Sequence, residues 1–225
     1  MSDYYTGWRA QYYNFIWHTY NKRTLKAAEA MIDLAALRAV PERLERHPRV
    51  LDVACGTGIL LKWLLEQVPD LDAYGVDAST DMLARASVAL KGCSHAHLER
   101  VELGSDETAG LPYKSGTFDL ITFTNALHYL PDSVATLAGL GRLLAPAGQL
   151  VLEDYREREP SLILKVFKWL VRRVDPRHVR TYTLVEAKSL CRQAGLSVIC
   201  EKMFVIDWLC DGWALRASPA TTRNI

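Results

Sequence analysis

The residues with the clearest chemical potential form the stretch Asp52-Val-Ala-Cys-Gly-Thr-Gly58. An apolar run ends at Asp52, and a helical period begins after the glycines, at Ile59. This order predicts a buried strand whose carboxyl end turns into a helix, where open α/β sheets bind nucleotide-like ligands. Gly56 and Gly58 allow the loop backbone to approach a ligand or to adopt a positive φ. Asp52 adds a carboxylate that would accept hydrogen bonds from a cationic ligand.

The same loop departs from the pattern of dinucleotide-binding proteins. Their loop reads G-x-G-x-x-G, but here Leu61 stands where the third glycine would allow close packing of helix and strand. Asp52 would also repel a pyrophosphate. Both features disfavour NAD and favour a nucleoside that carries an ammonium and a sulfonium group.

The elements that must position this loop alternate between strand and helix, which predicts an α/β fold with a mostly parallel, Rossmann-like sheet and helices on both faces. A terminal pair of strands predicts an antiparallel hairpin at the sheet edge, for seven strands in all. Pro146 to Gly148 predict a turn before the fifth strand, and Ser79 or Thr80 is expected to cap a helix. The expected strands are 50–54, 73–77, 97–103, 118–124, 148–153, 195–205 and 212–218, and the expected helices are 24–38, 59–67, 81–90 and 133–144.

Length and charge predict one domain over residues 1–225, with a helical arm or lid at 1–40 and a substrate-side insertion at 156–192. The insertion has ten basic and four acidic side chains, a net charge of +6. The whole chain has 27 basic and 26 acidic residues, so no general field favours a nucleic-acid partner. The sequence does not indicate an oligomeric state.

The five cysteines have no C-x-x-C spacing, and their number is odd. They predict reduced thiols, and we expect neither disulfides nor a bound metal. No apolar segment reaches the length of a membrane-spanning helix, and we expect a soluble cytoplasmic protein.

Four motifs, in this order, give the chain a family resemblance: V-L-D-V-A-C-G-T-G, Y-G-V-D-A-S-x-D-M-L, L-P-Y-x-x-G-T-F-D-L-I and L-A-P-A-G-Q-L. Over residues 50–153 the chain resembles the class I S-adenosylmethionine-dependent methyltransferases, in particular the branch that methylates quinones, phospholipids and other small molecules. Any one of the motifs alone would be a weak signal.

The resemblance implies that S-adenosylmethionine is the cofactor and that residues 52–58 wrap its methionine part. Asp77, 19 positions beyond Gly58, would accept both ribose hydroxyls, although a cap of the next helix is its alternative role. Ala54 replaces the family's first glycine, which fits if its φ is negative. The implied cofactor contacts are Asp52, Ala54, Cys55, Gly56, Gly58, Asp77, Ala78, Met82, Asn125 at the amino-acid end, and Asp106 in preference to Glu107 at the adenine. For Cys55 the favoured interpretation is a buried apolar filler.

The acceptor site is expected beside residues 125–130 and under the aromatic N-terminal segment. His128 is a candidate base, or alternatively a hydrogen-bonded residue that opens the next helix, and Tyr13 is a candidate for the lid over the cofactor. Segment 161–174 is interpreted as a pocket cover in preference to a helix at a membrane surface. The predicted acceptor contacts are Tyr12, Trp17, Tyr129, Arg177, Arg180 and Tyr182. Core packing is the alternative for the aromatic residues, and surface solvation for the basic ones.

Three functional hypotheses follow. The first is methyl transfer to a small molecule, with a quinone or lipid headgroup as a narrower alternative. The second is an NAD(P) oxidoreductase, and the third is a cofactor-binding protein without catalysis. Arsenite is disfavoured as an acceptor, because Cys191, Cys200 and Cys210 fall near the terminal strands.

Overall fold

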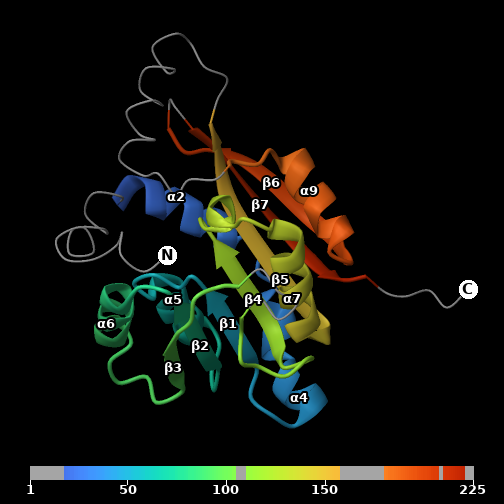
Figure 1. Ribbon diagram of the computed structural model, residues 1–225. Helices are drawn as coiled ribbons and strands as arrows, with labels where there is room; N and C mark the ends of the chain where they lie inside the picture. The colour runs from blue at the N-terminus through green and yellow to red at the C-terminus, as the bar shows by residue number, and fades with distance from the viewer. Residues whose placement is uncertain (1–17, 105–109, 158–179, 208–209, 221–225) are drawn as a thin grey trace, which may run out of the picture.

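The computed structural model describes residues 18–104, 110–157, 180–207 and 210–220. Its centre is a twisted seven-stranded sheet in the order β3-β2-β1-β4-β5-β7-β6 (Figure 1). The strands are β1 (Arg49–Val53), β2 (Asp72–Asp77), β3 (Ala96–Arg100), β4 (Phe118–Thr124), β5 (Leu144–Glu157), β6 (Leu196–Val205) and β7 (Cys210–Pro219). The first five run parallel, and β7 is inserted antiparallel between β5 and β6. The predicted sheet and its terminal hairpin are confirmed.

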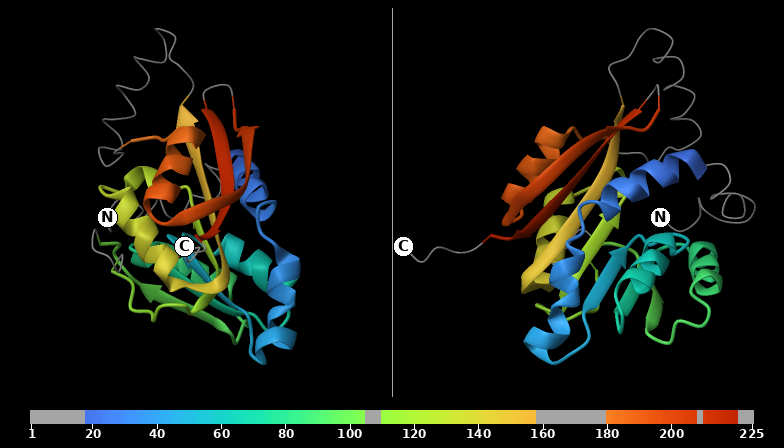
Figure 2. Two further views of the ribbon diagram at one scale, coloured as in Figure 1. Left: turned by 90° about the vertical axis from the view of Figure 1, so that its right-hand side faces the viewer. Right: turned by 180° about the vertical axis from the view of Figure 1, so that it is seen from behind.

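Helices cover both faces of this sheet (Figure 2). One apolar cluster joins a sheet face to α7 (Ser133–Leu143) and α9 (Leu184–Gln193), and it includes the fully buried Trp213. The other cluster joins the opposite face to α2 (His18–Glu29), α3 (Leu34–Arg38) and α5 (Ile59–Gln67). The remaining helices are α4 (Val40–Leu44), α6 (Thr80–Ala89) and the short η1 (Leu127–Tyr129). The two helical layers pack on the sheet from opposite faces. The carboxyl ends of the parallel strands lie together at one edge of this sheet.

The helix predicted over 24–38 is wrong as a single element, because the chain breaks after Glu29 and restarts at Leu34. Asp33 caps the second helix through the Ala36 N–H, at 3.1 Å. The buried amide of Gln149 also accepts from the Asp33 N–H and donates to the Asp33 carbonyl, at 2.9 and 3.1 Å. A tertiary contact with β5 therefore decides this boundary.

Two predicted strand boundaries also change. The segment Pro146 to Gly148 lies within β5 instead of in a turn before it, at a shift in the register between β4 and β5. A Cβ on Gly148 would come within 2.8 Å of the Phe118 carbonyl, so glycine permits this close approach. Strand β3 ends at Arg100, and the predicted strand residues Val101 and Leu103 instead line a pocket.

Three further helices begin at side-chain caps, and the predicted cap at Ser79 is confirmed. Ser79 accepts the Met82 N–H at 3.3 Å, Asp132 accepts the Ala135 N–H at 2.9 Å, and Thr183 forms a capping box with Glu186. No helix in the described part of the chain is long and apolar enough to cross a membrane.

Candidate active site

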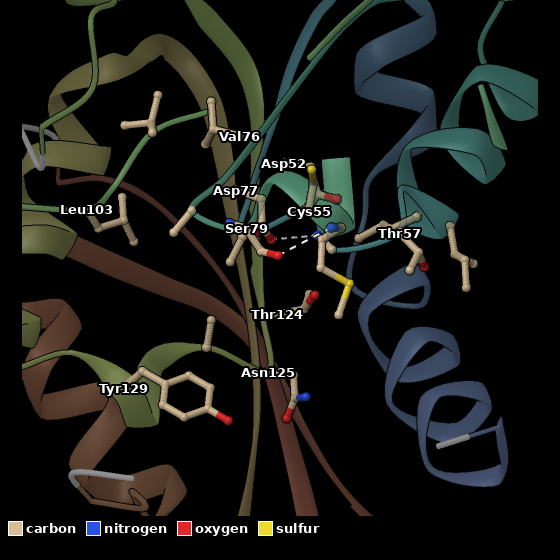
Figure 3. Close-up of a pocket in the computed structure, with 18 of the residues that line it drawn as sticks. Asp52, Cys55, Thr57, Val76, Asp77, Ser79, Leu103, Thr124, Asn125 and Tyr129 are labelled. Atoms are coloured by element: carbon tan, nitrogen blue, oxygen red, sulfur yellow. Dashed lines mark hydrogen bonds between the residues drawn. The ribbon is translucent and has the colours of Figure 1, made fainter. Parts of the chain in front are cut away.

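A pocket opens at the carboxyl ends of β1, β2 and β4, beside the loop that joins β1 to α5 (Figure 3). Its walls include nine of the residues predicted from the sequence as site residues. These are Asp52, Ala54, Cys55, Gly56, Asp77, Ala78, Met82, Asn125 and Tyr129. They come together because parallel strands place their carboxyl ends at one edge of a sheet.

The loop after β1 is held in a left-handed conformation. Ala54, Gly56 and Gly58 have φ values of 57°, 53° and 74°. Alanine at position 54 was expected to fit the loop with a negative φ, and this expectation is therefore wrong. Alanine adopts this conformation at a cost of about 1–2 kcal/mol, which the surrounding hydrogen bonds must offset. One of these bonds runs from the Cys55 N–H to the Val76 carbonyl, at 3.0 Å.

Gly58 packs closely against α6 and is not among the residues that line the described pocket, so its contact with the cofactor stays a prediction. It caps α5, and a Cβ at this position would lie 3.0 Å from the Ala86 Cβ on α6. Gly75 is packed closely too, since a Cβ there would meet Leu61 at 2.7 Å. The close approach that the third glycine gives dinucleotide-binding loops is thus provided elsewhere in this chain.

Asp77 braces the loop from the end of β2. Its Oδ2 accepts the Gly56 N–H at 2.9 Å, and its Oδ1 accepts the Ser79 N–H at 2.8 Å. Burial raises the pKa of the carboxyl, against the effect of these backbone donors. Ser79 is the residue that caps α6, so capping is not the role of Asp77. Each Asp77 oxygen has a second lone pair, which is suited to a ligand hydroxyl.

Asp52 is the second carboxylate of the pocket, and it is only 2% exposed. Its Oδ1 accepts the Thr122 hydroxyl at 2.6 Å. Burial raises the pKa of Asp52 to about 7, and repulsion from Asp77 adds to the effect of burial. A bound cation would favour the ionised form of this carboxyl.

Burial raises the pKa of two groups near the pocket, the thiol of Cys55 and the carboxyl of Glu153. Cys55 lines the pocket, and burial raises the pKa of its thiol well above the usual value, which supports its interpretation as an apolar filler. Glu153, paired in register with Thr124, is fully buried, and neither carboxyl oxygen has a hydrogen-bond partner among the described residues. Burial and the neighbouring Asp154 raise the pKa of Glu153 well above its usual value, which favours the protonated form of this carboxyl.

His128 lies just beyond β4, buried and outside the pocket wall that the structure describes. Its Nδ1 lies 2.8 Å from Asp154 Oδ1, and Asp154 also accepts the backbone N–H groups of His128 and Tyr155. Because that carboxylate acts as an acceptor, Nδ1 is the donor of the pair. The geometry agrees with the alternative in which His128 is a hydrogen-bonded residue opening a helical turn.

Two residues that were predicted to contact the acceptor interact with other side chains of the protein. Arg180 forms an ion pair with Glu186, and the Tyr182 hydroxyl lies 3.1 Å from Ser133 Oγ. Neither residue lines the described pocket, so their predicted contact with the acceptor is not supported by this geometry. The predicted residues Tyr12, Tyr13, Trp17, Asp106 and Arg177, and segment 161–174, lie outside the described residues.

Several pocket residues were missed by the sequence analysis. Thr57 and Ile59 lie inside the recognised loop motif, so their position in it was an available signal. Thr24 and Leu25 come from α2, and only the tertiary structure brings that helix to the pocket. The other missed residues are Leu60, Val76, Ser79, Val101, Leu103, Thr124, Ala126 and Leu130.

Comparison with known proteins places this geometry in a family. The model of a methyltransferase domain matches residues 20–201. The chain belongs to the methyltransferase domain family. The predicted class I methyltransferase is therefore confirmed for family and fold.

Individual relatives agree with this assignment. The chain is 34% identical over 140 residues to a demethylmenaquinone methyltransferase of Thermus thermophilus, and 32% identical over 143 residues to that of Lactiplantibacillus plantarum. Each match covers 62% of this chain, and the two cover 62% and 58% of the relatives, so the chain matches about three fifths of their length. An O-methyltransferase family protein from Burkholderia thailandensis has a similar fold, with a TM-score of 0.70 at 16% identity, over 96% of this chain and 60% of that one.

Proposed function

We propose that this protein transfers a methyl group from S-adenosylmethionine to a small-molecule acceptor. The observation that carries the proposal is the pair Asp52 and Asp77, which line one pocket on either side of the Gly56 loop. Asp77 offers two acceptor oxygens to the two ribose hydroxyls. Asp52 offers a buried carboxyl whose ionised form a cationic cofactor stabilises.

The reaction is an in-line displacement. The acceptor nucleophile forms a bond to the methyl carbon while the carbon–sulfur bond breaks, and the sulfur retains the electron pair as a neutral thioether. A protonated acceptor also loses a proton to a base or to water. The protein contributes by holding nucleophile and methyl group in line and by excluding water. We assign Tyr129, in η1 beyond β4, to the side of the pocket where the acceptor enters, and Asn125, directly after β4, to the amino-acid end of the cofactor.

Within this reaction, a flat apolar acceptor of the quinol type is the narrower proposal. It is supported by the demethylmenaquinone methyltransferases among the relatives. It is also supported by the apolar side chains of Val101, Leu103 and Leu130 in the pocket wall.

Transfer of the methyl group tests the proposal. Purified protein is mixed with S-adenosylmethionine that carries an isotope-labelled methyl group. The acceptor is either a naphthoquinol without a ring methyl group or phosphoethanolamine, and products are identified by mass spectrometry. Labelled naphthoquinol above the Asp77→Ala background is the expected result. Labelled phosphoethanolamine alone would overturn the quinol proposal and leave the methyltransferase proposal standing. Cofactor binding without transfer to these acceptors or to any component of a metabolite extract would favour a non-catalytic protein.

A parallel titration distinguishes the methyltransferase proposal from the NAD(P) oxidoreductase hypothesis. Calorimetry with S-adenosylmethionine is expected to give saturable binding, whereas NADH fluorescence is expected to stay unchanged on mixing. The opposite pair of results would reject the methyltransferase proposal.

A further inference from the structure

Two imidazoles and a carboxylate converge at the edge of the sheet opposite the pocket. His47 precedes β1, Asp72 begins β2, and His95 precedes β3. Their ligand atoms all lie within 4.8 Å of one another. These residues stand at the amino ends of three adjacent parallel strands, whereas the cofactor pocket is at the carboxyl ends.

The distances suit one small cation. Nδ1 of His95 lies 3.1 Å from Asp72 Oδ1, and Nδ1 of His47 lies 3.5 Å from the same oxygen. Ligand atoms at about 2.0–2.1 Å from a tetrahedral zinc ion are about 3.3 Å apart. The two imidazole rings meet edge to face with centroids 5.3 Å apart, and both side chains are 46% exposed. Small rotations of these exposed rings would complete the three-ligand set.

The backbone holds the three positions in place. The Asp72 N–H donates to the carbonyl of Pro48, next to His47, at 2.9 Å. The Ala73 N–H donates to the His95 carbonyl, also at 2.9 Å. The parallel register of β1, β2 and β3 continues from these bonds. The ligands are therefore preorganised by the sheet and not only by their own side chains.

Local charge is compatible with a cation. Arg46 is a positive group near Asp72, but both of its terminal nitrogens bind the Asp119 carboxylate, at 2.7 and 2.9 Å. Asp72 is 22% exposed, so its carboxylate lies at a surface where water can fill remaining coordination positions.

We propose that His47, Asp72 and His95 bind one divalent transition-metal ion of the zinc type. Two imidazoles and one carboxylate suit zinc, cobalt or nickel, whereas magnesium prefers an all-oxygen set. This site is separate from the methyl-transfer pocket, and it differs from the expectation, drawn from the sequence, that the chain binds no metal. The bound ion would link the amino ends of β1, β2 and β3, which are distant in sequence. It would therefore stabilise the folded state.

Metal titration of tag-free, chelator-treated protein tests the site. Calorimetry with zinc, supported by the visible spectrum with cobalt, is expected to give one equivalent of binding. Asp72→Asn and His95→Gln should each weaken that binding by at least about tenfold. Zinc should raise the melting temperature of the native protein but not of Asp72→Asn, and S-adenosylmethionine affinity should stay unchanged in both variants.

Two control variants locate the ion. His97→Gln removes an exposed histidine that stacks on Tyr74, and Cys93→Ser removes the thiol nearest in sequence to His95. Both should bind zinc as the native protein does. Absence of saturable binding at millimolar zinc, or binding that survives Asp72→Asn but not Cys93→Ser, would overturn the proposal. Circular dichroism of each variant identifies any loss that arises from misfolding.

Discussion

Asp77 has two tasks at once, because the carboxyl that faces the pocket also holds the loop beside it. Its oxygens accept the backbone N–H groups of Gly56 and Ser79. Removing the side chain therefore removes two loop contacts as well as any ligand contact. An experiment on Asp77 needs a readout for both effects.

We predict that Asp77→Ala weakens S-adenosylmethionine binding by at least about tenfold, since it removes the acceptors of both ribose hydroxyls and loosens the loop. Calorimetry measures the dissociation constant, and chemical denaturation measures stability in parallel. Glu66→Ala, which removes an exposed acid on α5, is the matched control and should bind normally. Unchanged affinity in Asp77→Ala would refute the assignment of this residue.

Asp52 predicts a pH dependence of cofactor binding. Burial raises the pKa of its carboxyl to about 7, so the group is largely protonated at pH 6 and largely ionised at pH 8. The cationic cofactor favours the ionised form, and affinity should therefore rise with pH by about tenfold over this range. Calorimetry at several pH values measures the slope. Asp52→Asn should bind more weakly and lose this slope, and a steep slope in that variant would assign the titration to another group.

At the scale of the elements, the loop between β1 and α5 contains a residue with a strained backbone and a glycine in close contact with a neighbouring helix. Ala54 occupies left-handed space, and Gly58 allows α5 to begin against Ala86 of α6. The loop thus depends on two helices and two strands for its shape.

We predict that Ala54→Gly raises the free energy of unfolding by up to about 1 kcal/mol. The substitution relieves a left-handed alanine at a gain of about 1–2 kcal/mol, partly offset by the larger entropy of glycine in the unfolded chain. Urea denaturation measures the difference. Ala84→Gly, at an exposed helical position of α6, is the control of opposite sign and should lose about 1 kcal/mol. Destabilisation by Ala54→Gly would show that the loop has a different conformation in solution.

At the scale of the molecule, the pocket draws on elements from distant parts of the chain: α2, the β1–α5 loop, the end of β2 and the end of β4. A ligand that contacts all of these elements should stabilise the native state as a whole.

We predict that S-adenosylmethionine at 100 times its dissociation constant stabilises the fold by about 2.7 kcal/mol. For a chain of this size, that corresponds to a rise in melting temperature of roughly 5–10 °C. Differential scanning calorimetry measures the shift, with NADH as the control ligand. Equal shifts with both ligands would contradict a selective cofactor pocket.

Much of the fold could be predicted from the sequence, because the strands and helices have clear hydrophobic periods and local caps. Helix 59–67 and strand 118–124 match the structure in both boundaries. The predicted boundaries were wrong where residues distant in sequence decide them. Examples are Asp33, whose backbone binds Gln149, and the irregularity of β5 around Gly148. The cofactor-side residues were predictable because they lie in contiguous motifs at strand ends.

The sequence by itself determined the glycine loop, the acids at 52 and 77 and the alternation that brings them to one sheet edge, because each is encoded within a few neighbouring residues. Only the tertiary structure decided that α2 contributes Thr24 to the pocket, that Gly58 packs on α6, and that His128 binds Asp154. It also brought together His47, Asp72 and His95, which have no common motif. These contacts join residues far apart in the chain, and their partners are set by strand order and register, which local periodicity does not encode.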